Sequence, residues 1–383
     1  MAKPPGKRTV SQRPLYIGID ARLAYKRGVG TYTANLILGL SRVDKVNRYA
    51  LFNAPKALRD RLSNPRFRGV EVPISNPAYY EQVLLPRAAE RMGLDLLHYT
   101  DNSGTTFGDL PYVLTLHDTF HLRPLREVRP HAGPWYRLVY LYKRWANPRS
   151  AEKARAILTV SEYSKKCIVE QMGVAPGKIT VTLEGVDRSL FPRRPRKPSK
   201  LFKILVHGAA DERKNIPNIL KCAKWLKDEG FSFQMVIVGM DQAELRSTNY
   251  LEEAIQLGVG DRLEWAGQVP SWVLAATYAE VDLFLFPSLL EGFGLPVLEA
   301  FSSGVPVVTS NGSALPEVAG DAALTVDPRD PVAMAKAVER AMKSPALRRS
   351  LIRKGLKRAA LFNWDRTARE TLKVYEKVKG SAL

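Results

Sequence analysis

The feature that most constrains this chain of 383 residues is an alternation of short apolar runs with helical segments, which stops once and then restarts. It stops at residues 191–200, FPRRPRKPSK, where three prolines and a run of cations cannot form a core element. Alternating strands and helices are typical of a parallel sheet covered on both faces. The sequence therefore predicts an α/β protein of two doubly wound, Rossmann-like domains. The predicted strands are Leu15–Ile19, Tyr49–Phe52, Leu94–Tyr99, Tyr112–Leu116 and Ala156–Val160, followed after the break by Lys203–Val206, Gln234–Val238, Arg262–Trp265, Leu283–Phe286, Val305–Thr309 and Ala323–Val326.

The same break divides the chain into segments. We expect a first domain at 14–190, a basic proline-rich linker at 191–202 and a second domain at 203–361. A basic tail at 1–13 precedes them, and a helix at 362–383 follows them and could cross back to the first domain. Ligands of open α/β sheets bind outside the carboxyl ends of the strands, so the expected site is a cleft between the two domains.

The formal net charge of +20 is concentrated in four blocks, at residues 1–13, 121–155, 192–203 and 343–358. Basic blocks attract anions, which favours an anionic surface or a polyanion as partner, although each block could equally be a solvated surface. Two cysteines cannot form a disulfide framework, which indicates a reducing compartment. No apolar stretch approaches the ~18 residues of a spanning helix, so we expect a cytoplasmic protein with no standard secretion signal.

Residues 134–149 (PWYRLVYLYKRWANPR) interleave aromatic side chains with cations at helical spacing. Such a helix suits the head-group boundary of a membrane, and its aromatic stripe could equally pack into the first domain. Together with the basic blocks, this segment predicts peripheral association with the inner face of the cytoplasmic membrane.

The segment most informative about chemistry is SLLEGFGLPVLEA, at residues 288–300. Its two glutamates, Glu291 and Glu299, flank a glycine turn, and Pro296 suits the first turn of a helix. Unpaired backbone amides of Gly292 to Leu295 would then form a ready site for a phosphate group. A capping glutamate and a surface glutamate around a tight turn would give the same spacing.

This segment and the one after it, SNGSALPEVAGDAALTVDP, resemble the donor-site signature of the family-4 retaining glycosyltransferases of GT-B architecture. Among the subgroups, the chain looks closest to bacterial mannosyltransferase-like enzymes of surface-polysaccharide and O-antigen assembly. Further similarity to the family occurs in order along nearly the whole chain, in IDARLAYKRGVGTYTANLI (19–37), LTLHDTF (114–120), ILTVSEYSKK (157–166), EGVDRSLF (184–191) and RKN (213–215).

The resemblance implies transfer of a sugar from a nucleotide-sugar to an acceptor hydroxyl, with retention of the anomeric configuration and without a metal ion or cofactor. It assigns catalytic roles to Glu291, against the donor sugar, to His117, near the leaving group, and to Lys214, at the donor phosphates. Stabilising a departing diphosphate and an oxocarbenium-like sugar requires cations and a carboxylate of this kind. The implied donor-binding set is Gly28, Gly30, Arg213, Lys214, Gly292, Phe293, Gly294, Leu295 and Glu299, with Glu299 on the ribose hydroxyls.

Two positions depart from the family pattern. Residues 208–210 are Gly-Ala-Ala where many members have an arginine, and Arg213 could serve instead. Glu184 stands where the family often has an asparagine. A metal site at His117, Asp118 and His121 is not favoured, because the stretch is predicted as a strand end and loop, where two histidines four apart do not converge.

The resemblance points to GDP-mannose as donor, with a UDP-sugar as second choice, and to a glycan or lipid-linked acceptor. Two other functions stay open. The chain could be a catalytically silent relative that only binds a nucleotide-sugar. It could also be a basic protein that binds polyanions or nucleic acid, although no nucleic-acid motif occurs in it and we expect no nucleic-acid partner.

Overall fold

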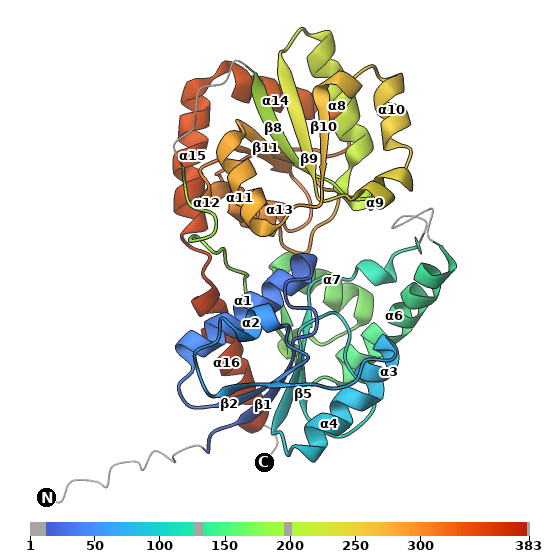
Figure 1. Cartoon of the computed structure of the whole chain (residues 1–383), viewed down its shortest axis with the longest axis vertical. Coiled ribbons are helices and arrows are strands. Elements are labelled where there is room, and N and C mark those ends of the chain that lie inside the picture. The colour runs from blue at the N-terminus through green and yellow to red at the C-terminus, as the bar shows by residue number, and fades with distance from the viewer. Residues whose placement is uncertain (1–12, 126–132, 195–200, 381–383) are drawn as a thin grey trace, which may run out of the picture.

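The structure is a computed structural model that describes residues 13–125, 133–194 and 201–380 (Figure 1). The predicted basic tail, apart from its last residue, lies outside the described residues. So do 126–132 of one basic block, 195–200 of the linker and the last three residues of the predicted C-terminal helix.

Within the described part of the chain, the first domain holds a seven-stranded parallel sheet in the order β3-β2-β1-β4-β5-β6-β7. Strands β4 and β5 are buried along their whole length, as expected for a sheet covered on both faces. The strands are β1 (Tyr16–Asp20), β2 (Arg48–Phe52), β3 (Phe67–Val70), β4 (Leu96–Tyr99), β5 (Tyr112–Leu116), β6 (Ala156–Thr159) and β7 (Ile179–Val181). The helices are α1 (Arg27–Val43), α2 (Lys56–Arg59), α3 (Pro77–Tyr79), η1 (Tyr80–Leu84), α4 (Leu85–Arg91), η2 (Phe120–Leu122), α6 (Pro134–Lys153), α7 (Glu162–Met172) and η3 (Pro176–Lys178).

The second domain, over the residues described, repeats this plan with a six-stranded parallel sheet in the order β10-β9-β8-β11-β12-β13. Its strands are β8 (Phe202–His207), β9 (Phe233–Val238), β10 (Leu263–Gly267), β11 (Leu283–Phe286), β12 (Val307–Ser310) and β13 (Leu324–Val326). Its helices are η4 (Glu212–Lys214), α8 (Ile216–Asp228), α9 (Gln242–Arg246), α10 (Tyr250–Gln256), η5 (Gly260–Arg262), α11 (Ser271–Glu280), α12 (Leu295–Ser302), α13 (Leu315–Ala319), α14 (Pro331–Lys343) and α15 (Pro345–Ala359). The last helix of the chain is α16 (Trp364–Gly380).

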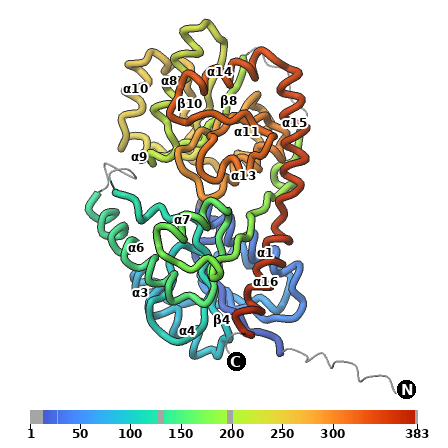
Figure 2. Tube along the Cα trace, turned by 180° about the vertical axis from the view of Figure 1, so that it is seen from behind, coloured from blue at the N-terminus to red at the C-terminus, as the bar shows by residue number. Residues whose placement is uncertain are grey.

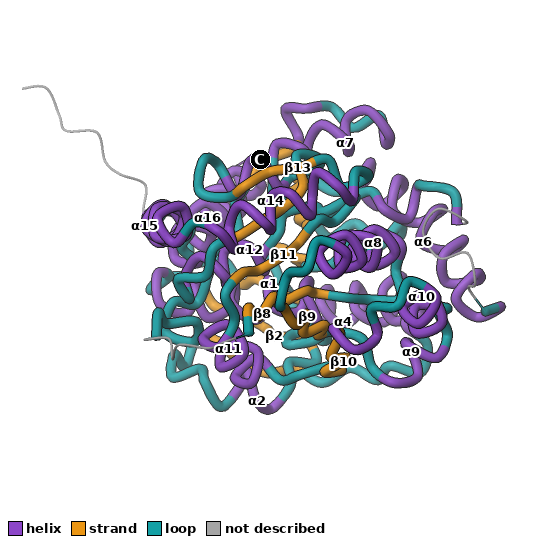
Figure 3. Tube along the Cα trace, turned by 90° about the horizontal axis from the view of Figure 1, so that it is seen from above, coloured by secondary structure: helices purple, strands orange, loops and turns teal. Residues whose placement is uncertain are grey.

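Side chains of this second sheet alternate between two apolar cores. Along β8, Ile204 and Val206 join the core under α8 and α14, whereas Leu205 joins the core under α11 and α12. Seen from above, α8 and α11 lie on opposite sides of the line of strands (Figure 3). Burial of both faces explains the continuous apolar runs in the sequence, and it confirms the predicted class of two doubly wound domains.

Strands β3 and β7 were not predicted, and both lie at the edges of the first sheet. In β3 only Phe67 is buried, and β7 has only three residues. An edge strand is covered less completely, so it needs no continuous apolar run and carries a weak sequence signal.

The C-terminal helix α16 belongs spatially to the first domain. The chain leaves the second domain through α15 and returns to pack α16 against α1, which is clearest from behind (Figure 2). The two helices approach closely at Gly39, where a Cβ would lie 2.8 Å from the carbonyl oxygen of Trp364. A buried polar contact fixes the far end, because the Tyr375 hydroxyl lies 2.6 Å from Nδ1 of His98 on β4.

We expect Tyr375→Phe to destabilise the first domain by about 1–3 kcal/mol, because it leaves Nδ1 of the buried His98 without its partner. Urea unfolding followed by circular dichroism measures the change. The matched control is Tyr79→Phe, since Tyr79 is 48% exposed, and it should change the stability by less than about 0.5 kcal/mol. Equal stability of the two variants would show that the contact does not anchor α16.

Candidate functional site

The predicted site residues follow strand ends of both sheets. His117 follows β5, Lys214 lies in η4 after β8, and Glu291 lies in the loop between β11 and α12. The carboxyl ends of parallel strands meet at one edge of each sheet, and these two edges face each other between the domains (Figure 1). Residues separated by about 170 positions are therefore brought to one place.

Lys214 and Glu291 are in direct contact. Nζ of Lys214 lies 2.7 Å from Oε1 of Glu291, and both side chains are less than 20% exposed. The same Nζ lies 4.6 Å from the ring centroid of Phe286 at the end of β11. The structure thus brings together a cation and a carboxylate, which the sequence analysis assigned separately to phosphates and to a sugar.

Arg213 is held by carboxylates of both domains. Its guanidinium lies 2.8 Å from Asp211, 3.7 Å from Asp118 of the first domain, and 3.8 Å above the ring of Phe120. Burial lowers the pKa of the guanidinium, but the negative charges of Asp211 and Asp118 have the larger effect, so the pKa is raised. Arg213 is therefore a bridge between the domains, a contact that the sequence did not predict.

His117 is buried and has a partner at each ring nitrogen. Nε2 lies 3.0 Å from the carbonyl oxygen of Thr100, and Nδ1 lies 3.5 Å from the carboxylate of Glu184. The ring of Tyr32 contacts it edge-on at a centroid distance of 4.7 Å. Burial opposes protonation of the imidazole, but the carboxylate of Glu184 outweighs burial and raises the pKa of His117.

Gly292 also lies at a contact between the two domains. A Cβ at this position would overlap the carbonyl oxygen of His117. The carbonyl oxygen of Gly292 accepts hydrogen bonds from the hydroxyls of Ser161, at 2.6 Å, and Ser164, at 3.0 Å. The absence of a side chain here therefore permits the contact between the domains.

Another contact between the domains lies beside that of Gly292. The carboxylate of Glu317, on α13, accepts hydrogen bonds from the backbone amides of Glu162, at 3.0 Å, and Tyr163, at 3.4 Å. These amides open α7, so a carboxylate of the second domain supplies negative charge at the start of a helix of the first. Glu317 could not be predicted from the sequence, because a capping glutamate from another domain leaves no local signal.

Glu299 lies on α12 and contacts a tyrosine of the same domain. One of its carboxylate oxygens lies 3.4 Å from the hydroxyl of Tyr278 on α11. Burial raises the pKa of Glu299 to about 7, a shift that Tyr278 opposes and Glu184 reinforces. The predicted ribose contact therefore falls on a carboxyl group that is only partly ionised at neutral pH.

The predicted glycines differ in what surrounds them. A Cβ on Gly30 would overlap the carbonyl oxygen of Leu23, whereas a Cβ on Gly28 would meet nothing within 4 Å. Gly294 has φ of 121° and lies against Leu315, so both its backbone and its neighbours favour glycine. Between these turns, Phe293 is buried against Phe362, and Leu295 begins α12.

An unpredicted ionic cluster lies at the end of β1. Arg22 contacts Asp20 at 3.2 Å and Glu81 at 2.5 Å, and all three side chains are less than 10% exposed. Burial raises the pKa of Asp20 to about 6, although Arg22 opposes the shift. The motif IDAR contains two of these residues, but its sequence does not indicate the third partner.

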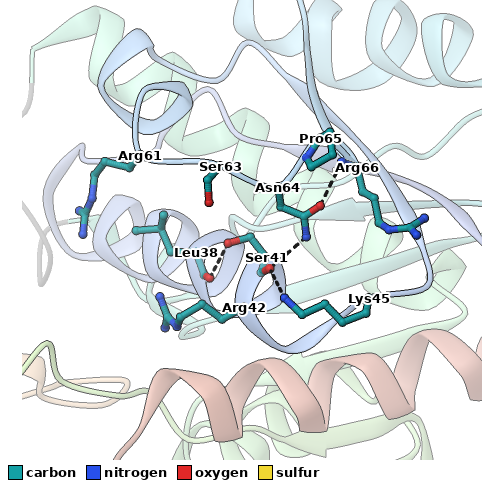
Figure 4. Close-up of a pocket in the computed structure, with 9 residues that line it drawn as sticks. All are labelled: Leu38, Ser41, Arg42, Lys45, Arg61, Ser63, Asn64, Pro65 and Arg66. Atoms are coloured by element: carbon teal, nitrogen blue, oxygen red, sulfur yellow. Dashed lines mark hydrogen bonds between the residues drawn. The ribbon is translucent and has the colours of Figure 1, made fainter.

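A basic hollow of about 550 Å³ lies apart from these residues, between the end of α1 and the loop before β3 (Figure 4). It contains no residue predicted for the site. Its cations have local partners, since Arg42 contacts Asp365 at 2.6 Å and Arg61 donates to the hydroxyl of Tyr25 at 3.0 Å.

Three further observations concern the described residues alone. No three His, Cys, Asp or Glu residues among them are grouped as a metal site requires. Within the same residues, no helix is long and apolar enough to cross a membrane. Cys167 and Cys222 are both free thiols.

Comparison with known proteins identifies the family. The family model described as Glycosyltransferase Family 4 matches residues 26–190, and the one described as Glycosyl transferases group 1 matches residues 187–358. The chain is 32% identical over 307 residues to the MMP alpha-(1->4)-mannosyltransferase of Mycolicibacterium hassiacum, which covers 76% of this chain and 72% of that protein. It is 30% identical over 258 residues to the O-antigen chain mannosyltransferase B of Escherichia coli, which covers 64% and 66%.

Solved structures show the same fold along almost the whole chain. The sucrose-phosphate synthase of Thermosynechococcus elongatus superimposes with a TM-score of 0.75 at 19% identity, covering 97% of this chain and all of that one. WaaG, a glycosyltransferase involved in lipopolysaccharide biosynthesis, superimposes with a TM-score of 0.68 at 13% identity, covering 94% and 99%. The chain therefore belongs to the family-4 glycosyltransferases and has the GT-B fold, as its motifs predicted. It spans about two thirds of the length of the curated relatives it matches.

We expect Gly292→Ala to separate the domains without unfolding them. The new Cβ would overlap a backbone atom of His117. Because Gly292 has no left-handed φ, alanine does not strain its backbone, and the substitution should weaken only the contact between the domains. Small-angle X-ray scattering should show a larger radius of gyration at an unchanged circular dichroism spectrum. Gly177→Ala, whose Cβ meets nothing within 4 Å, is the control. An unchanged radius for Gly292→Ala would mean that the contact does not set the domain arrangement.

Proposed function

We propose that this protein is a retaining, metal-independent glycosyltransferase that moves mannose or a similar hexose from a nucleotide-sugar to a glycan or lipid-linked acceptor. The observation that carries the proposal is the 2.7 Å contact of Lys214 with Glu291, opposite His117, at the carboxyl ends of both sheets. Relatives named as O-antigen chain mannosyltransferases support mannose and a place in cell-surface polysaccharide biosynthesis. Anabaena Alr3699/HepE, a protein of the same fold, was solved in complex with UDP and glucose. A UDP-sugar is therefore the second choice of donor after GDP-mannose.

Each residue of the site has a defined task in this proposal. Lys214 has three protons on Nζ, so it can bind a donor phosphate while it still contacts Glu291. Arg213 adds a second positive charge to the diphosphate, and the amides of Gly292 to Leu295 at the start of α12 add the field of the helix N-terminus. Glu291 then faces the sugar, where its carboxylate stabilises developing positive charge.

The remaining predicted residues complete the donor site. His117 approaches the leaving group from the first domain, and Gly28 and Gly30 bring their backbone amides toward the diphosphate. Glu299 accepts hydrogen bonds from the ribose and, because its pKa is near 7, we propose that it ionises as the hydroxyls bind. Two cations of the chain supply the positive charge that a divalent metal supplies in other transferases, which is why we propose transfer without a metal.

We expect the protein to select one base in a thermal-shift panel of GDP, UDP, ADP and dTDP with their sugars. GDP and GDP-mannose should raise its melting temperature, and the other ligands should not. EDTA should leave the shift unchanged. Lys214→Ala should abolish the shift, because the variant removes a phosphate contact.

Glu291→Gln should bind the same nucleotide but lower the transfer rate by about 10²–10³-fold in a radiolabelled-sugar assay.

Lys224→Ala is the control for Lys214→Ala, since Lys224 pairs with Asp228 on the exposed face of α8. It should leave both the shift and the transfer rate unchanged. A nucleotide shift in the wild type without transfer to any acceptor would favour the catalytically silent relative. No shift with any nucleotide would instead favour the polyanion-binding protein.

We also propose that the protein associates peripherally with the inner face of the cytoplasmic membrane through α6. Trp135 and Trp145 are 67% and 43% exposed, and Leu138 and Leu141 are exposed between them. Residues three or four apart share one face of a helix, so these four side chains form an apolar stripe. Val139 and Tyr142 of the same helix are half-buried and lie outside this stripe.

Cations accompany the stripe on the same helix. Arg144 is exposed, and the guanidinium of Arg149 lies 4.9 Å from the ring centroid of Trp145. An exposed aromatic stripe with adjacent cations suits an anionic lipid surface, where rings enter the boundary and cations meet head groups. A lipid-linked acceptor would then be presented at the same surface as the first domain.

We expect the wild type to sediment with vesicles that contain phosphatidylglycerol and to be released by high salt. Trp135→Ser should lower binding several-fold, because it removes an aromatic anchor. The matched control is Trp272→Ser on α11 of the second domain, since Trp272 is 71% exposed. No sedimentation of the wild type at low salt, or equal losses in the two variants, would refute membrane binding through α6.

A further inference from the structure

Glu184 lies where the chain passes from the first domain to the second. It follows β7, and its side chain is only 5% exposed. The backbone here cannot shift easily, because a Cβ on Gly185 would overlap the backbone of Trp364, and the amide of Val186 bonds to the carbonyl of Phe362. A carboxylate is therefore fixed in a buried place at the junction of the domains, where an unpartnered charge would be costly.

The hydrogen-bond partners of His117 limit where its ring can carry hydrogens. The carbonyl oxygen of Thr100 can only accept, so Nε2 of His117 must carry a hydrogen. Nδ1 lies 3.5 Å from the carboxyl group of Glu184, which can only accept when it is ionised. Both partners are satisfied when the ring carries a hydrogen on each nitrogen, which makes it an imidazolium paired with Glu184.

We propose that Glu184 is a positioning residue of the donor site, which holds the ring of His117 as an imidazolium between its own carboxylate and the Thr100 carbonyl. This inference rests on the proposed function, and it assigns a role to the position where the chain departs from the asparagine of its family. The backbone of His117 meets Gly292, so the pair is held next to the loop that leads into α12.

Other charged groups near the pair are engaged with partners of their own. Asp101 lies 3.3 Å from Lys143, Glu291 lies 2.7 Å from Lys214, and Glu299 contacts Tyr278. His98 is neutral, because burial lowers its pKa to about 3, and Tyr32 meets the His117 ring with its edge. Glu184 is therefore the carboxylate that balances His117. It does so although burial raises the pKa of Glu184 itself, a shift that the imidazolium opposes.

The pair implies a defined pH dependence. With Glu184 present, His117 loses its proton only as the pH rises through a pKa that lies above its ordinary value. In Glu184→Gln, burial acts on the ring without the carboxylate, so the pKa of His117 should fall below the ordinary value of about 6.5. Nε2 should retain its hydrogen, and Nδ1 should accept from the new amide.

The experiment is nitrogen-15 NMR of the full chain labelled at histidine, combined with transfer kinetics between pH 5.5 and 9. The chain has five histidines, and the His117 signal is assigned by its loss in His117→Gln. In the wild type, both ring nitrogens of His117 should carry the imidazolium signature at pH 7. In Glu184→Gln the ring should be neutral with the hydrogen on Nε2, and kcat/KM should fall at least about tenfold, with its basic limb moved to lower pH.

Glu162→Gln is the control, since Glu162 is exposed at the start of α7. It should change neither the NMR titration nor the pH profile. Glu184→Asp keeps the charge and should preserve the imidazolium, which tests the inference even if Glu184→Gln does not fold. A wild-type His117 that titrates at or below about 6.5, or an unchanged titration in Glu184→Gln, overturns the inference. Wild-type protein that shows the imidazolium but transfers no sugar would instead count against the proposed function.

Discussion

The arrangement of this protein depends on a contact that requires the absence of a side chain. Gly292 of the second domain meets the backbone of His117 in the first, and Ser161 and Ser164 hydrogen-bond the same glycine. Because the contact joins the loop after β11 to the loop after β5, it sets the positions of residues contributed by both sheets. Glu317 reinforces it by accepting the amides at the start of α7. The geometry of the site thus follows from backbone packing between domains.

The charges of the site are paired with one another. Lys214 contacts Glu291, and Arg213 is shared between carboxylates of both domains. Under the proposed function, a nucleotide diphosphate would bring negative charge into this arrangement and would have to share these cations with carboxylates that already contact them. Because Nζ of Lys214 has three protons, the proposed donor could bind it while the contact with Glu291 is kept. In this view the ion pairs hold the side chains in place before the donor arrives.

The sequence predicted the layers of the fold better than the contacts of the site. Strands such as Tyr112–Leu116 and Leu283–Phe286 were predicted at their observed bounds, because burial on both faces leaves an unbroken apolar run. The motifs placed Lys214, Glu291 and His117 after strand ends, which parallel topology brings to one edge. They could not show that Arg213 reaches Asp118, or that Glu184 faces His117, because those distances depend on how two separately folded domains meet. The unusual residue at 184 was visible, but its partner was not.

The return of α16 to the first domain has a consequence for the modular use of this fold. Its chain continues from α15 of the second domain, yet its buried face packs on α1 and its Tyr375 reaches into the first sheet. The last helix of the chain therefore follows the second domain in the sequence but packs into the core of the first. A hybrid that joins the first half of this protein to the second half of a relative would combine α1 with a foreign C-terminal helix. An exchange of the second domain between relatives should accordingly replace residues 201–363 as an internal segment and leave α16 with the first domain, against which it packs.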